Sequence, residues 1–332
     1  MMNPYIGHES QLYGVEEHQL VGGKGDGIRL LQVKNGKGME FTVSRERCAD
    51  IARLSFCGRN MSFFSPCGYV SPAYYDDKDM GFLKSFTAGF LATCGLSSVG
   101  SPSVDDGKVW PLHGTIGNTP ADHIYWRIEN DAIHIHALVR DENIFFHKLV
   151  LHREIICSLK RNELVIRDRI ENCGDQESPA MLLYHINIGY PLLSERSEIY
   201  IPSTKVIPRN SQSAEDLNTW NQVIPPQKQF KEQCYFHNFE KKGIAAIYNP
   251  DIELGMAISF DAKQLNYFTE WKMMGIRDYV LGLEPGNCHP DGRAQMKKEG
   301  KLTIIKPGES ISYEVEISML NGRKEWNEKE KK

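Results

Sequence analysis

Three segments decide the fold of this chain: DAIHIHALVRD (131–141), FHKLVLHREIICSL (146–159) and ELVIRDRIEN (163–172). In each segment apolar and polar residues alternate, which is the two-residue period of a strand with one buried face and one solvent face. We therefore predict successive antiparallel strands in the middle of the chain.

The same kind of segment recurs on both sides of this centre. IRLLQV (28–33) and MEFTVS (39–44) flank KNGKG, which predicts a hairpin with an Asn-Gly turn. Further apolar or alternating segments are MLLYHINIGYPLL (181–193), GIAAIYNP (243–250), ELGMAISFDAK (253–263), LNYFTEWKMMG (265–275) and GKLTIIKPGESISYEVEISML (300–320). Many short strands with few helices indicate an all-β fold, a large antiparallel β-sandwich.

No fixed-period repeat and no linker divides the chain. We expect one domain over residues 28–320, preceded by an N-terminal extension (1–27) and followed by a charged tail (321–332) that frays. Residues 69–100 are rich in Gly, Ser and aromatic residues without a clear period. They predict a long ordered loop with a short helix around residues 83–91.

Composition narrows the choice of partner. The formal net charge is −4 and 25% of the residues are charged, so neither nucleic acid nor a membrane surface is expected as a partner. The first residues contain no basic start followed by an apolar run, so we expect no signal peptide. The eight cysteines form no CxxC pair, and we expect free thiols and a cytoplasmic protein.

One carboxylate stands out in YVLGLEPGNCHPDGR (279–293). Glu284 ends an apolar strand and is followed at once by Pro285 and Gly286. A strand fixes the position of such a group, and partial burial can tune its pKa for proton transfer. A helix cap or a surface salt bridge would explain Glu284 equally well on this segment alone.

Several histidines are also candidates. His113 precedes Gly114, which permits close backbone approach, although a structural role is equally compatible. His185 and Asn187 share one strand face, where each needs a hydrogen-bond partner. His134 and His136 also share a face and could hold a metal ion. No third ligand with suitable spacing follows them, so no metal site is expected.

The order of the motifs resembles the galactose mutarotase (aldose 1-epimerase) superfamily, and in particular an uncharacterised bacterial branch described as aldose 1-epimerase-like. The resemblance covers about residues 28–320. The motifs that carry it are ADI (49–51), TCGLSSVG (93–100), LHGTIGNTPA (112–121), YHINIGYPLL (184–193) and LEPGN (283–287).

This resemblance implies a β-supersandwich, with Glu284 as general base, His185 as general acid and His113 as a residue that binds the sugar near its ring oxygen. It implies interconversion of the α and β anomers of a free monosaccharide or derivative, without a cofactor, by a monomer or homodimer. A non-catalytic carbohydrate-binding protein and an epimerase or isomerase of a modified sugar remain alternatives.

A sugar also needs flat apolar surfaces and polar groups that recognise hydroxyls. The candidates for this role are Arg47, Asp50, Asn118, Asn187, Trp271 and Lys272. Core packing would also explain Trp271, and a surface ion pair would explain Arg47 and Asp50. Tyr184 precedes the acid histidine, where the characterised galactose enzymes carry asparagine, so galactose specificity is not implied.

Overall fold

The three central segments form the longest strands of an eight-stranded sheet. In the computed structural model, which describes residues 4–330, every second residue of β12 from Ile133 to Val139 is buried. This alternation follows from the sequence pattern and turns one face of the sheet toward the core. The strands, in spatial order, are β11 (His123–Glu129), β12 (Ala132–Glu142), β13 (Lys148–Ser158), β14 (Glu163–Asn172), β24 (Ser310–Asn321), β20 (Leu254–Asp261), β19 (Lys242–Asn249) and β16 (Glu198–Tyr200).

A seven-stranded sheet carries the segments around His185 and Glu284. Its central strand β15 is buried along nearly its whole length, as expected for a strand covered on both faces. The sheet consists of β17 (Lys205–Pro208), β18 (Gln233–Asn238), β21 (Tyr267–Met274), β22 (Tyr279–Gly286), β15 (Ser178–Ile188) and β23 (Thr303–Ile305), with β8 (Leu91–Leu96) paired to β15.

A five-stranded sheet contains the predicted N-terminal hairpin, which is confirmed as β2 and β3. Its strands are β1 (Gly14–Gln19), β2 (Arg29–Lys34), β3 (Met39–Ser44), β4 (Asp50–Phe56) and β5 (Arg59–Asn60). Two small pairs are β6 (Phe63–Phe64) with β7 (Ala88–Gly89), and β9 (Ser103–Asp105) with β10 (Lys108–Trp110). The α-helices are α1 (Ser211–Glu215), α2 (Arg293–Lys298) and α3 (Gly322–Glu330).

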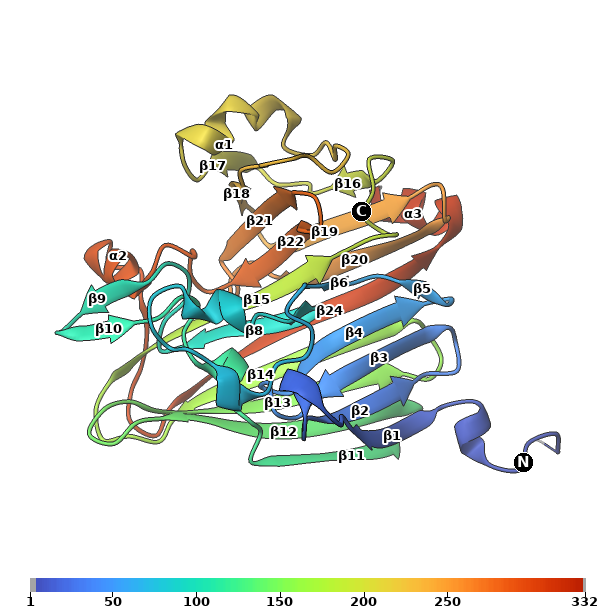
Figure 1. Ribbon diagram of the computed structural model, residues 1–332, viewed down its shortest axis with the longest axis horizontal. Helices are drawn as coiled ribbons and strands as arrows, with labels where there is room; N and C mark the ends of the chain where they lie inside the picture. Colours follow the sequence, from blue (N-terminus) through green and yellow to red (C-terminus); the bar gives the residue numbers. More distant parts are fainter. Residues whose placement is uncertain (1–3, 331–332) are drawn as a thin grey trace.

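The sheets are stacked in layers around one hydrophobic core. Figure 1 shows the five-stranded sheet and the sheet of β15, β21 and β22 lying in front of the long strands of the eight-stranded sheet. The core draws on all three sheets, with Phe41 from β3, Ile135 from β12 and Tyr184 from β15 among its members. The all-β sandwich prediction is confirmed.

Two local predictions were wrong. Within residues 69–100, which suggested a loop with a helix around residues 83–91, β8 joins the seven-stranded sheet and the helical parts are two short 3-10 turns, Pro72–Tyr74 and Gly81–Lys84. The tail forms helix α3, because Trp326 is 1% exposed and stacks on Tyr248 with ring centroids 5.6 Å apart. Residues 1–3 and 331–332 of the extension and tail lie outside the described part of the chain.

Two simpler properties follow from the described residues. All eight cysteines are free thiols. No helix between residues 4 and 330 is long and apolar enough to cross a membrane.

Candidate active site

Strand alternation places His185 and Glu284 side by side on one face of the seven-stranded sheet. In β15, Tyr184 and Ile186 point into the core, so His185 points to the opposite face. The antiparallel register pairs Leu183 with Gly286 and Ile186 with Leu283, which sets His185 opposite Glu284. Neighbouring strands in the centre of a sheet therefore fix both side chains.

The two side chains form a buried pair that has not closed into a hydrogen bond. Nε2 of His185 lies 3.3 Å from Oε1 of Glu284, and the residues are 5% and 2% exposed. Among residues 4–330, neither Oε1 of Glu284 nor Nδ1 of His185 has a hydrogen-bond partner. Buried polar atoms are nearly always paired, and catalytic contacts often tighten only when a substrate binds.

His113 approaches the same place from the loop before the 3-10 turn at Ile116–Asn118. Its backbone adopts a left-handed conformation, with φ of 59°, and its amide donates to the Gly100 carbonyl over 2.8 Å. A side chain at Gly114 would clash with the Gly95 and Ser98 carbonyls, so this close approach requires glycine. The rings of His113 and His185 lie 5.5 Å apart, and Nδ1 of His113 has no partner among the described residues.

Aromatic side chains enclose the two histidines. The Trp271 ring lies 5.3 Å from the His185 ring, and Phe86 lies 5.4 Å from it on another side. Phe82 lies 5.2 Å from the His113 ring. Trp271 stays partly exposed and donates from Nε1 to Glu232, so its indole offers a fixed flat surface at the edge of the site.

Gly282 makes room for the carboxylate. It precedes Glu284 by two residues, so the two share a strand face. A Cβ at Gly282 would lie 2.3 Å from Oε1 of Glu284 and 3.1 Å from Cβ of Trp271. The absence of a side chain here therefore sets where the Glu284 carboxylate can lie.

Burial controls the charges of the three groups. It raises the pKa of the Glu284 carboxyl well above its usual value, and the nearby Arg209 guanidinium opposes this shift only in part. Burial lowers the pKa of His185 to about 4. Burial, together with the charges of His185 and Arg209, lowers the pKa of His113 to about 3. Both imidazoles are therefore uncharged at neutral pH, and the site favours an uncharged His185–Glu284 pair with one proton between them.

Two predicted binding residues contribute further unpaired polar atoms. Asn187 donates to the His185 carbonyl over 2.9 Å, but its Oδ1 has no partner among the described residues. Asn118 accepts a hydrogen bond from Ser85, the neighbour of Phe86, and its Nδ2 has no partner among the described residues. Both residues therefore retain hydrogen-bonding capacity for a ligand.

The remaining candidates are engaged inside the protein. Arg47 donates to the carbonyls of Gly117, Val70 and Ser85. The Asp50 carboxylate accepts from Thr93 and from the buried Arg153. Nζ of Lys272 donates to three carbonyls in residues 219–222, which it holds together. These residues support the loops and strands around the site.

Sequence reasoning missed Arg209. It follows β17 in a segment that appeared to be only a polar loop, and no local pattern singles it out. Its guanidinium donates to Asp291, Ser101 and the Pro290 carbonyl. These contacts connect three loops near Glu284. Because the Arg209–Asp291 salt bridge joins segments that are distant in sequence, neither segment alone predicts it.

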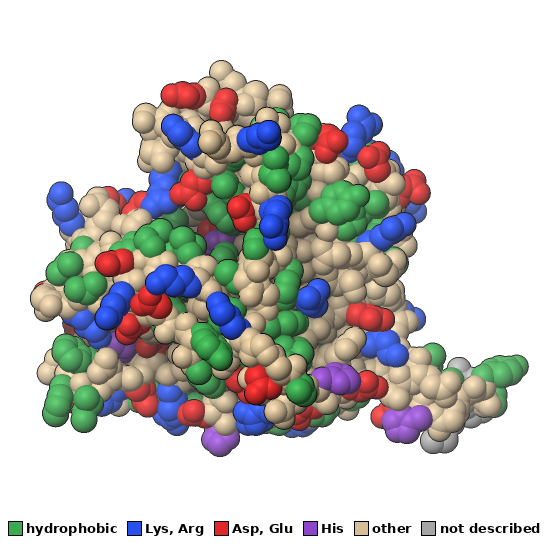
Figure 2. Space-filling view, in the orientation of Figure 1, with side chains coloured by type: hydrophobic (Ala, Val, Ile, Leu, Met, Phe, Trp, Pro, Cys, Tyr) green, Lys and Arg blue, Asp and Glu red, His purple; other side chains and the backbone are tan. Residues whose placement is uncertain are grey.

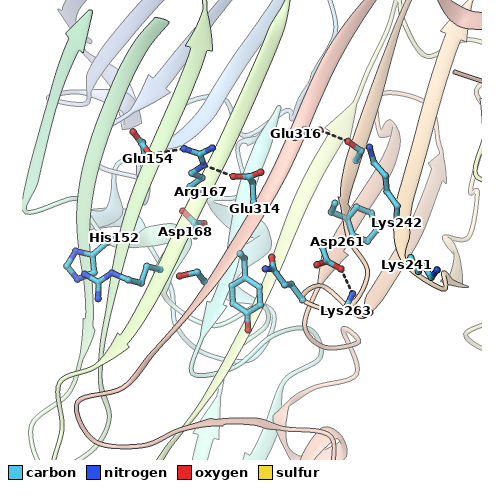
Figure 3. A pocket seen from close by; sticks show the side chains of 16 residues that line it. His152, Glu154, Arg167, Asp168, Lys241, Lys242, Asp261, Lys263, Glu314 and Glu316 are labelled. Atoms are coloured by element: carbon cyan, nitrogen blue, oxygen red, sulfur yellow. Dashed lines mark hydrogen bonds and ion pairs between the residues drawn. The ribbon is translucent and has the colours of Figure 1, made fainter. Parts of the chain in front are cut away.

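One face of the molecule is hollowed. Figure 2 shows a recess between the lobe that carries α1 and the loops around β9 and β10, with a histidine side chain visible in it. A separate groove of about 860 Å³ runs along the outer face of the eight-stranded sheet (Figure 3). Charged side chains that pair with one another line that groove, such as Arg167 with Glu154 and Glu314. Among its described lining residues, that groove lacks a buried acid and base with unpaired atoms such as Glu284 and His185.

The stacked antiparallel sheets have the galactose mutarotase-like sandwich fold, as comparisons with known structures show. A protein from Klebsiella pneumoniae described as a "putative aldose 1-epimerase" superimposes with a TM-score of 0.91 at 26% identity, over 97% of this chain and 89% of that one. A galactose mutarotase-like protein from Clostridium acetobutylicum gives a TM-score of 0.65 at 16% identity, over 94% and 99% of the two chains. Galactose 1-epimerase from Lactobacillus acidophilus gives 0.64 at 12% identity, over 94% and 100%.

At the level of sequence, residues 25–319 match the family described as domain of unknown function DUF4432, and the chain belongs to that family. No protein with a curated description matches the chain.

Proposed function

We propose that this protein is an aldose 1-epimerase-like isomerase that interconverts the α and β anomers of a free monosaccharide or a close derivative. The observation that carries the proposal is the buried His185–Glu284 contact, in which Oε1 of Glu284 and Nδ1 of His185 have no hydrogen-bond partner in residues 4–330. The fold shared with the Klebsiella protein supports it. We also expect the protein to act in the cytoplasm, since all eight of its thiols are free.

Mutarotation needs one group that accepts a proton and one that donates it. Glu284 removes the proton of the anomeric hydroxyl while His185 protonates the ring oxygen, and the C1–O5 bond breaks to give the open aldehyde. The aldehyde rotates about the C1–C2 bond and the ring closes on its other face. The two groups exchange roles during closure, so the enzyme returns to its starting protonation state.

The electrostatics constrain how this cycle begins. In the empty site burial favours the proton on Glu284 and a neutral His185. A sugar hydroxyl that donates to the Glu284 carboxylate stabilises the charged form, and the shared proton can then pass to His185. The 3.3 Å contact is short enough for this transfer. His113 lies beside His185, which supports a role for it in hydrogen-bonding the sugar near its ring oxygen.

The first test is exchange NMR on a panel of aldoses, deoxy-sugars and uronic acids with the purified protein. Acceleration of anomer exchange for one sugar, lost in Glu284→Gln, is the expected result. Saturable sugar binding without acceleration would contradict catalysis and would favour the carbohydrate-binding alternative. Acceleration that survives Glu284→Gln would remove Glu284 from the mechanism.

A further inference from the structure

A cluster of three side chains lies on the outer face of the eight-stranded sheet, away from the candidate active site. His134 and His136 project from the partly exposed face of β12, because Ile133, Ile135 and Ala137 fill the core face. Glu154 projects from the same face of β13 and is paired directly opposite His136. The antiparallel register therefore brings the two histidines of β12 together with Glu154 of β13, which lies eighteen residues after His136 in the sequence.

We propose that His134, His136 and Glu154 bind a divalent transition-metal ion of the Zn²⁺ class. Nδ1 of His134 lies 2.9 Å from Oε1 of Glu154, and Nε2 of His136 lies 3.9 Å from the same oxygen. One donor atom from each residue falls within 4.8 Å of the other two. Zn²⁺ binds nitrogen and carboxylate oxygen at about 2.0–2.2 Å, so tetrahedral ligand atoms lie about 3.3–3.5 Å apart. The observed separations bracket that value, and small side-chain rotations suffice to reach it.

The donor set also suits this class of ion. Two imidazoles and one carboxylate are a recurrent zinc set that leaves a coordination position open. The three side chains are 17–25% exposed, so the ion can enter from solvent and keep a water or an anion in the open position. Nε2 of His134 has no hydrogen-bond partner among the described residues, so the ring is hydrogen-bonded through Nδ1 alone.

Two arginines contact side chains of the proposed site. Nη2 of Arg127 lies 3.4 Å from Nε2 of His136, and Nη1 of Arg167 lies 3.8 Å from Oε2 of Glu154. Arg167 is also held by Glu314 (Figure 3), so it can leave Glu154 without losing its ion pair. Arg127 must move aside for the ion. The site should therefore bind metal reversibly, and its affinity should increase when Arg127 loses its charge.

The ion would join β12 to β13 across the sheet. It would stabilise the folded chain, since a ligand that binds only the folded state shifts the unfolding equilibrium. The ligands belong to the solvent face of the eight-stranded sheet, whereas the His185–Glu284 pair belongs to the seven-stranded sheet. Metal loading should therefore leave the proposed active site unchanged.

The test is a titration of the full-length protein with Co²⁺ followed by visible absorption, and with Zn²⁺ followed by calorimetry. Cys57→Ser and Cys173→Ser provide the background, because these two thiols are exposed and could bind metal themselves. His134→Ala and Glu154→Gln are each expected to weaken binding at least tenfold. Arg127→Gln is expected to strengthen it several-fold, which a merely structural hydrogen-bond network would not do.

The matched control is His152→Ala. His152 lies on β13 and contacts Glu171 on β14 over 3.1 Å, a His–Glu pair on the same sheet without a second imidazole. It should leave the metal affinity unchanged, and metal-free melting temperatures of all variants should match that of the background protein. Absence of binding at millimolar Zn²⁺ would overturn the proposal. So would a metal affinity of His134→Ala and Glu154→Gln equal to that of the background protein, or a loss of affinity in His152→Ala as large as in those two variants.

Discussion

Between residues 4 and 330 the protein contains two buried His–Glu pairs with the same N–O distance. His185 and Glu284 lie 3.3 Å apart, and so do His237 and Glu270. The second pair lies on the core-facing side of the same sheet, since Glu270 and Trp271 are neighbours in β21 and point to opposite faces. The distance between acid and base therefore cannot tell which pair acts on a substrate.

The surroundings of the two pairs differ. Nδ1 of His237 bonds Ser203 over 2.9 Å, and Trp220 covers the ring with centroids 4.8 Å apart. Both side chains of that pair are fully buried. His185 instead has an unpaired Nδ1, a second histidine beside it and the partly exposed Trp271 at its edge. Among the described residues, one carboxylate oxygen is unpaired in each pair, Oε1 of Glu270 and Oε1 of Glu284, so the difference lies in the unpaired imidazole nitrogen and in the partly exposed surroundings of His185.

The largest contrast is expected between the two carboxylates. Glu284→Gln should lower kcat for anomer exchange by about 10²–10⁴-fold, because it removes the general base while keeping the shape of the side chain. Glu270→Gln should change the rate by less than about threefold but lower the free energy of unfolding by about 1–3 kcal/mol, since it disturbs a buried polar contact. Exchange NMR and urea unfolding measure both. A comparable loss of rate in Glu270→Gln would show that the two pairs do not differ in their effect on catalysis.

The next largest effect concerns the space beside Glu284. Gly282→Ala should lower kcat roughly 10–100-fold, because the added methyl group displaces the carboxylate and misplacement by about 1 Å can cost 10²-fold. The pairing of β21 with β22 should survive, so the circular dichroism spectrum should not change. Glu284→Asp in the Gly282→Ala background shortens the acid and should recover part of the rate. If the Gly282→Ala variant alone had the wild-type kcat, Gly282 would not set the position of the carboxylate.

Most of the fold could be predicted from residue patterns, because alternation and turn chemistry are local. The hairpin of β2 and β3 and the strands β12–β14 followed directly from them. β8 was missed because its partner is β15, almost a hundred residues later, and its own sequence has no clear period. Helix α3 was missed because the burial of Trp326 depends on Tyr248, which only the tertiary structure brings near.

The site divides in the same way. Glu284 and His185 were found from short motifs, and the structure brings them together. Lys272 looked like a group that binds hydroxyls, but a buried ammonium satisfies nearby carbonyls, and only the fold places three of them within reach. Glu154 escaped notice as a third ligand beside the two histidines of β12, because its position depends on strand register.

The pH profile should sharpen the assignment of the reactive pair. At neutral pH the His185–Glu284 pair carries one titratable proton. Below about pH 4 His185 is protonated as well and neither group can act as a base, so kcat should fall about tenfold per pH unit. Burial raises the pKa of Glu284, so the pair loses its only proton at a pH well above the usual glutamate range, and activity should then fall again. A broad plateau between the two limbs is expected. The pH profile of the His237→Gln variant should keep both limbs. Loss of one limb in this variant would assign that limb to the His237–Glu270 pair.

The smallest expected effects separate two neighbours on β21. Trp271→Ala should raise KM about tenfold with a small change in kcat, since it removes a flat surface at the edge of the site and not a proton-transfer group. Lys272→Met should leave KM unchanged and lower the free energy of unfolding by about 1–3 kcal/mol, because it leaves the carbonyls of Trp220 and Gln222 without their donor. Steady-state kinetics gives KM and kcat for both variants, and urea unfolding gives their free energies of unfolding. If Lys272→Met raised KM while its stability stayed at the wild-type value, Lys272 would contact the sugar, and the contrast between the two faces of β21 would fail at this position.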